Sequence, residues 1–129
     1  MSLIDLQKKI GVTADGAWGP GTFKAAVAFY KLPKNRAAHF FAQTAHESGN
    51  FKAFSDYCKR PDIMTNPDLI SGELAFESAM WFFEKNKIWD LCDKGTDDAT
   101  ITAVTKKVNG GTIGLEDRIK HTHQYAGWL

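Results

Sequence analysis

Hydrophobic residues recur along most of the chain at intervals of three and four positions, the spacing of one face of an α-helix. The pattern is clearest in residues 71–86, where small and apolar side chains repeat from Leu74 to Phe83. With glycine, proline and capping residues as boundaries, this spacing predicts helices at residues 3–10, 22–32, 35–48, 71–86, 99–108 and 115–129, and a single turn at 88–92.

The expected helix boundaries rest on residues that cap or break helices. Thr22, Asn35 and Ser71 are the expected N-caps, while Gly11 and Gly49 are expected to end the helices that precede them. Residues 99–108 contain β-branched side chains that also favour a strand, but no strand pair with alternating polarity is found in the sequence. The sequence therefore predicts a mainly α fold with little or no β-sheet.

Size and charge fit one soluble domain. The chain has 129 residues, 43% hydrophobic and 24% charged, with a net charge of +1. We expect a single domain over residues 1–129, a monomer, with no overall attraction to nucleic acid. No apolar run reaches the ~20 residues that span a bilayer, so no membrane insertion is expected. The first ten residues lack the apolar centre of a signal peptide, which predicts a cytoplasmic protein.

Cysteine and histidine positions argue against metal or redox chemistry. Cys58 and Cys92 are far apart and form no CxxC pair, so buried reduced thiols are expected rather than a disulfide. His39 and His46 are two helical turns apart, and Asn50 occupies the position that a second histidine would take in HExxH. We expect no metal and no cofactor.

Two carboxylates could carry acid–base chemistry. Glu47 lies in the last turn of an expected helix, where the helix dipole disfavours negative charge and so favours a protonated general acid. Asp56 follows nine positions later, across a break at Gly49, and could share a cleft with Glu47. Glycoside hydrolysis uses such a pair. The alternative is that both are ordinary solvated surface residues.

A third candidate is the turn formed by Asn109, Gly110 and Gly111. Two glycines beside an asparagine allow a tight turn in which the amide and backbone groups meet a polar ligand. Most such triplets are only turns, and the spacing of a phosphate-binding loop is missing.

Taken together, three segments resemble the family 19 chitinase-like glycoside hydrolases, in particular their phage endolysin branch. They are NRAAHFFAQTAHESGNF (residues 35–51), TNPDLISGELAFESAMWFFEKNKIWDLCDKG (65–95) and ITAVTKKVNGGTIGLEDR (101–118). The start, LQKKIGVTADGAWGPGTFKAA (6–26), resembles a peptidoglycan-binding signature, so residues 1–32 are expected to pack on the domain as such a segment. The resemblance implies a compact lysozyme-like helical fold and inverting hydrolysis of β-1,4 bonds in peptidoglycan or chitin-like glycan.

The resemblance also assigns roles to individual residues. Glu47 matches the family's general acid, and His46 precedes it in the same motif as a substrate-binding residue. Asn109 and Gly110 match the substrate-contacting loop, and Arg118 matches an arginine that organises the cleft. In the N-terminal signature, the matching residues mostly fix a turn; they are Asp15, Gly16, Gly19, Pro20 and Thr22.

The middle of the chain departs from the family pattern. The second catalytic glutamate and a GRG-type sugar-binding strand are missing, and Phe51 to Ser55 lead directly into Asp56. In one interpretation Asp56 replaces the glutamate as the base. In the other, which we favour, a deletion joins two similar stretches and Asp56 aligns with a non-catalytic position. Ile113 is a smaller departure, because the family usually has a polar residue in that loop.

Three hypotheses about function follow. The first is a compact endolysin with Glu47 as acid and Asp56 as base, made in the host cytoplasm and released to the wall through a membrane pore. The second is a weak or inactive member that binds wall or chitin oligosaccharides or serves as a scaffold. The third, an interaction protein that uses Trp81, Trp89 and Trp128, rests on nothing specific, since core tryptophans are the commoner case.

Overall fold

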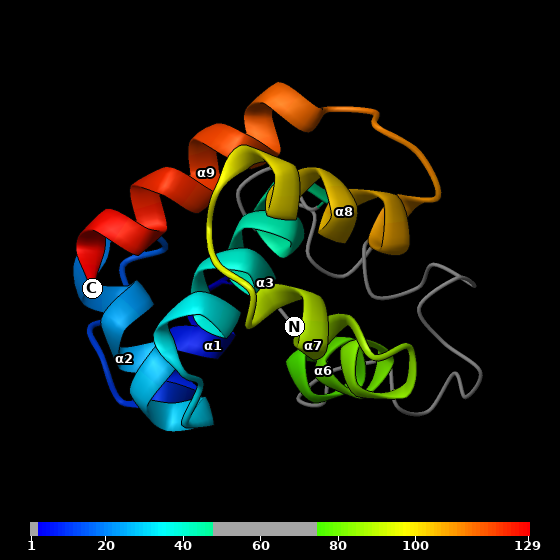
Figure 1. Ribbon diagram of the computed structural model, residues 1–129. Coiled ribbons are helices and arrows are strands. Elements are labelled where there is room, and N and C mark those ends of the chain that lie inside the picture. Colours follow the sequence, from blue (N-terminus) through cyan, green and yellow to red (C-terminus); the bar gives the residue numbers. More distant parts are fainter. Residues whose placement is uncertain (1–2, 48–74) are drawn as a thin grey trace.

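The computed structural model describes residues 3–47 and 75–129 (Figure 1). Over these two ranges it contains seven helices and no strand, which confirms the prediction of a mainly α fold. The helices are α1 (Leu3–Ile10), α2 (Pro20–Tyr30), α3 (Lys34–Glu47), α6 (Ala75–Lys85), α7 (Ile88–Cys92), α8 (Asp98–Asn109) and α9 (Leu115–Trp128). No helix among the described residues is long and apolar enough to cross a membrane.

Helix α3 is the central helix of the structure. Every residue from 37 to 45 is buried, so this helix is enclosed on all sides rather than amphipathic. Its neighbours are α7, α8 and above all α9, which runs along it (Figure 1). Because α3 packs on three helices, the polar side chains that it carries inward must find partners inside the protein.

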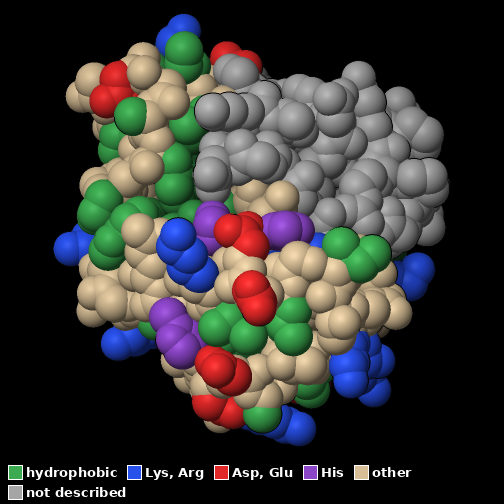
Figure 2. Space-filling view, turned by 90° about the horizontal axis from the view of Figure 1, so that it is seen from above, with side chains coloured by type: hydrophobic (Ala, Val, Ile, Leu, Met, Phe, Trp, Pro, Cys, Tyr) green, Lys and Arg blue, Asp and Glu red, His purple; other side chains and the backbone are tan. Residues whose placement is uncertain are grey.

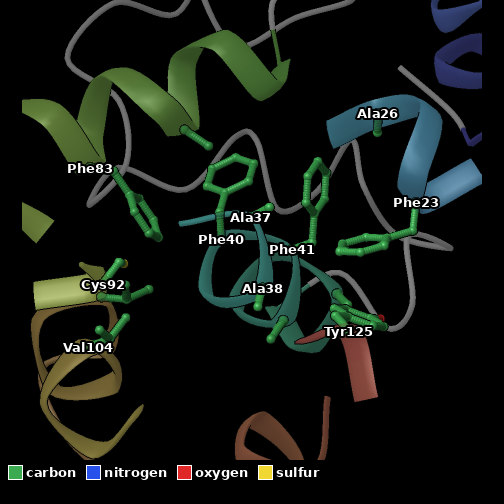
Figure 3. Close-up of a cluster of buried hydrophobic side chains, with 14 of the residues drawn as sticks. Phe23, Ala26, Ala37, Ala38, Phe40, Phe41, Phe83, Cys92, Val104 and Tyr125 are labelled. Carbon is green, nitrogen blue, oxygen red and sulfur yellow. The ribbon is translucent and has the colours of Figure 1, made fainter. Parts of the chain in front are cut away.

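Aromatic rings on α3 contact a phenylalanine of α6 on one side and a phenylalanine of α2 on the other (Figure 3). The ring of Phe40 lies 5.1 Å from that of Phe83 on α6, in an edge-to-face arrangement. The ring of Phe41 points the other way, 5.6 Å from Phe23 on α2, and Tyr125 of α9 lies against Phe23 at 5.1 Å. Such buried aromatics contribute most of the hydrophobic stabilisation in a core of this size.

Two of the expected N-caps are wrong. Helix α2 begins at Pro20 with Gly19 as its N-cap, because proline at the first position needs no hydrogen-bond partner for its nitrogen. Thr22 is thus inside the helix and buried. Helix α3 begins at Lys34, one residue before Asn35, and its first turn is closed by the N–H of Ala37 donating to the carbonyl of Pro33, at 2.9 Å.

Of the other expected helix boundaries, some can be compared with the structure and two lie outside the described residues. Gly11 ends α1 in the left-handed conformation with φ of 82°, as predicted. Ser71 and Gly49 lie outside the described residues. The sequence around residues 99–108 forms helix α8 despite its β-branched residues, and Asp97 caps it by accepting hydrogen bonds from the backbone N–H and the hydroxyl of Thr100, at 3.3 and 2.6 Å.

A single buried side chain, Gln7, organises the N-terminal turn. Its amide nitrogen lies 2.9 to 3.1 Å from the carboxylate of Asp15, the carbonyl of Ala17 and the hydroxyl of Thr22. Its amide oxygen accepts from the N–H of Gly16 at 2.8 Å. The residues that resemble a peptidoglycan-binding signature therefore hold a turn between α1 and α2, as expected for most of them.

Of the three tryptophans named above, two pack in the core, as does Cys92, whereas Trp81 lies at the surface. Trp89 is buried, and Trp128 packs against the core; Trp81 is 41% exposed. Cys92 is a buried free thiol, as predicted, and burial raises its pKa to about 12. Cys58 lies outside the described residues.

Candidate functional site

The two predicted catalytic carboxylates are only partly covered by the structure. The backbone of Glu47 forms the last residue of α3, in agreement with its predicted place at a helix end. Its side chain is not among those the structure describes, and Asp56 lies outside the described residues. The pairing of these two carboxylates therefore stays a prediction, and the described part of the site consists of the groups around the end of α3.

Arg118 ties α3 and α9 to the loop of residues 110–114. Its guanidinium is buried, with 1% of the residue exposed. One nitrogen donates to the side-chain oxygen of Gln43 on α3, and Nε donates to the carbonyl of Ile113 at 3.1 Å. The amide nitrogen of Gln43 donates in turn to the hydroxyl of Thr105 on α8, at 3.0 Å. This buried network fixes three helices and one loop relative to each other.

His46 is held by Asp117 at the first turn of α9. The distance from Nδ1 of His46 to Oδ2 of Asp117 is 2.6 Å. On the other side, Oδ1 of Asp117 lies 3.5 Å from Nδ1 of His121. Partial burial raises the pKa of Asp117, but the hydrogen bond from His46 and the charges of His121 and Lys120 outweigh it, so the pKa lies below its usual value. Asp117 lies in the first turn of α9, where the positive end of the helix dipole stabilises its negative charge.

Gly114 makes room for the ring of His46. It is the N-cap of α9, with φ of 70°. A Cβ atom at this position would overlap Cε1 and Nε2 of His46. Glycine is therefore required here for two reasons, the left-handed backbone and the close approach of the imidazole.

The loop that contains Asn109 and Gly110 has a clear structural role. Asn109 is the last residue of α8 and is half-buried. Gly110 is the C-cap, with φ of 78°, and its N–H donates to the carbonyl of Lys106 at 2.8 Å. Ile113 is 76% exposed at the far end of the loop. The capping function explains the conformation of Gly110 without a ligand, so its substrate-binding role stays a prediction.

His39 and His46 face different parts of the protein. His39 is fully buried, and its Nε2 lies 2.6 Å from the carbonyl of Gly95. Since a carbonyl only accepts, Nε2 carries the proton, and Nδ1 is buried without a hydrogen-bond partner among the described residues. In residues 3–47 and 75–129, no three His, Cys, Asp or Glu side chains are arranged so that they could hold a metal ion.

We call Gln43, His46, Asp117 and Arg118 the α3–α9 polar cluster. Figure 2 shows histidine and acidic side chains next to one another on the upper face of the molecule. The cluster supplies a hydrogen-bonding imidazole beside a carboxylate, one residue before Glu47, and a buried cation behind them. Such a group can bind and orient a polar ligand, and it holds the last turn of α3 in a fixed place.

No protein-family model, no curated protein and no solved structure matches this chain. The features of this chain that bear on function are therefore its sequence motifs and the geometry at the end of α3.

Sequence reasoning missed three residues of this site: Gln43, Asp117 and Gly114. The sequence did contain an indication for Gln43, since it is a polar residue in the middle of a mostly apolar stretch of α3. Asp117 precedes Arg118, but its partner is 71 positions away in the sequence and no local spacing indicates it. The need for Gly114 comes from contact with the same distant side chain.

Proposed function

We propose that this chain is an endolysin-type glycoside hydrolase that cleaves β-1,4 bonds in the glycan strands of peptidoglycan. Glu47 is the general acid, and Asp56 is the provisional base. The chain acts as a monomer, made in the host cytoplasm and released to the wall through a membrane pore.

The observation that carries this proposal is the surroundings of the last turn of α3. His46, the neighbour of Glu47 in the sequence, is fixed by Asp117, and Gln43, one turn before Glu47, is fixed by Arg118. These residues come from the separate motifs that resemble the hydrolase family, and they lie together in the fold. An acid at the end of a helix anchored in this way would be held in the orientation that proton transfer requires.

The test is clearance of Gram-negative cells whose outer membrane has been made permeable. Glu47→Gln removes the titratable proton at nearly constant size, and we expect it to lower clearance by about 10²- to 10⁴-fold. Glu116→Gln, an equally conservative change at an exposed position of α9, is the matched control and should lyse like the parent. Equal lysis by Glu47→Gln and the parent would overturn the mechanism.

A second candidate is a non-catalytic module that binds wall or chitin oligosaccharides. It is favoured by the departure in the middle of the chain, where Phe51 to Ser55 lead into Asp56 without the family's second glutamate. An inverting hydrolase needs two carboxyl groups about 6.5–9.5 Å apart to hold the attacking water. Co-sedimentation with purified wall, without release of reducing ends, would support this candidate, and absence of sedimentation would rule it out.

A further inference from the structure

The imidazole of His46 is held from two sides. Asp117 contacts Nδ1 at 2.6 Å, and Gly114 lies beside Cε1 and Nε2, so closely that a Cβ at this position would overlap both atoms. These contacts come from different elements, the first turn of α9 and the loop before it. The ring therefore has one orientation, in which Nδ1 faces Asp117 and Nε2 lies on the side of Gly114.

The contact with Asp117 also decides which nitrogen carries the proton. An ionised carboxylate only accepts hydrogen bonds, so Nδ1 of His46 must donate. A neutral imidazole with its proton on Nδ1 leaves Nε2 as an acceptor. Among the described residues, the charges that lower the pKa of Asp117 are those of His46, His121 and Lys120, and Tyr125 also lies within electrostatic reach of this carboxylate.

In the described part of the chain, the hydrogen bond of the His46 ring is made through Nδ1, and 24% of its side chain is exposed. Building on the proposed function, we propose that Asp117 is a positioning residue that holds His46 with Nε2 unprotonated, so that Nε2 accepts a hydrogen bond from the glycan. N-acetylated glycan strands offer two kinds of donor, sugar hydroxyls and acetamido N–H groups.

The first experiment measures the tautomer of His46 in the free full-length protein. Long-range ¹H–¹⁵N spectra at pH 8 distinguish protonated from unprotonated ring nitrogens, and His46→Gln assigns the signals. We expect His46 to carry its proton on Nδ1 and His39 to carry it on Nε2, because their acceptors lie on opposite nitrogens. A proton on Nε2 of His46 in the parent would overturn the inference.

Three variants separate positioning from general stability. Asp117→Ala removes the acceptor and should shift His46 toward the form protonated on Nε2, while Asp117→Glu keeps a carboxylate, which only accepts, and should partly restore the parent's tautomer. Glu116→Ala removes the neighbouring exposed carboxylate and should change nothing. A change in stability alone would not move the tautomer, so this signature is specific to positioning. An unchanged tautomer in Asp117→Ala would contradict the inference.

The second experiment adds a β-1,4-linked N-acetylglucosamine oligomer to the same samples. We expect the Nε2 signal of His46 to shift in the parent and the oligomer to bind Asp117→Ala about tenfold more weakly, the loss of one hydrogen bond. Binding that leaves Nε2 unchanged would overturn the part of the inference that concerns the ligand. If no oligomer binds, that part fails as well, and the lysis assay with Glu47→Gln shows separately whether the proposed function fails with it.

Discussion

Gly110 and Gly114 have nearly the same left-handed backbone, with φ of 78° and 70°, but different surroundings. A Cβ at Gly110 would meet no atom within 4 Å, whereas one at Gly114 would overlap the ring of His46. Alanine at either position costs about 1 kcal/mol of backbone strain. We expect Gly114→Ala to lower the free energy of unfolding by a further ~1–3 kcal/mol, the usual cost of overpacking, in urea titrations.

A double variant separates the two causes. Adding His46→Ala to Gly114→Ala removes the overlap, so the additional loss should disappear and only the backbone strain should be left. Equal destabilisation by Gly110→Ala and Gly114→Ala in the presence of His46 would contradict the close approach seen in the structure.

Arg118 is the second residue whose role can be measured directly. Arg118→Met keeps much of the volume but leaves the side-chain oxygen of Gln43 and the carbonyl of Ile113 without their donor. We expect a loss of about 2–4 kcal/mol in the free energy of unfolding, since the buried side-chain oxygen of Gln43 would stay unpaired. Lys120→Met, an exposed cation on the same helix, is the control and should change stability little. Similar losses in the two variants would show that the buried network around Arg118 contributes nothing to the free energy of unfolding.

At the scale of the elements, α3 contains a buried imidazole that makes its stability depend on pH. Burial lowers the pKa of His39 below 6.5, although its bond to Gly95 and the charge of Asp97 act in the opposite direction. Between this lowered pKa and about 6.5 the unfolded chain binds more protons than the folded one. The free energy of unfolding should therefore fall as pH drops below about 6.5, by up to about 1.4 kcal/mol per pH unit.

His39→Gln tests this dependence, because glutamine keeps an N–H donor for Gly95 and does not titrate. Urea titrations from pH 5 to pH 8 should show a flatter profile for this variant than for the parent. Carboxylates with lowered pKa, such as Asp97 and Asp117, lose their contribution only in a more acidic range. Parallel profiles for the parent and His39→Gln would contradict the prediction.

The elements themselves could be predicted from the sequence, but several of their ends could not. Hydrophobic spacing and the glycines indicated every described helix. The caps failed where a proline or a distant partner decided the boundary: Thr22 looks like an N-cap, but Pro20 already starts the helix and Gln7 binds the threonine hydroxyl. Asp97 caps α8 through local contacts and could have been recognised from its position before Thr100.

For the molecule as a whole, the rate at which Cys92 is alkylated measures whether the core is packed. Its thiol is buried and its pKa is raised to about 12, so almost none of it is the reactive thiolate at pH 8. We expect iodoacetamide at pH 8 to label Cys92 at least ~10²-fold more slowly in native protein than in urea, measured on the peptide that contains it by mass spectrometry. Mapping by peptide separates this residue from Cys58. Equal labelling with and without urea would contradict the packing around Cys92.

The candidate site was less predictable than the fold. Arg118 and His46 could be selected because they lie in motifs that resemble a hydrolase family. Their partners Gln43 and Asp117 could not be paired with them, since each pair joins α3 to α9 across more than 70 positions of the sequence. Only the packing of the two helices brings these groups together. Asp56 was selected on its spacing from Glu47 and as a possible replacement for the family's second glutamate, and it lies outside the described residues.

The proposed role of Glu47 as the acid of a glycoside hydrolase can be measured without cells. The measurement is release of reducing ends from purified peptidoglycan, with the parent and Glu47→Gln at equal concentration and with unfolding curves that show both are folded. We expect steady release by the parent and a loss of about 10²- to 10⁴-fold in the variant. Release that is the same in both, or no release by the folded parent, would contradict this role.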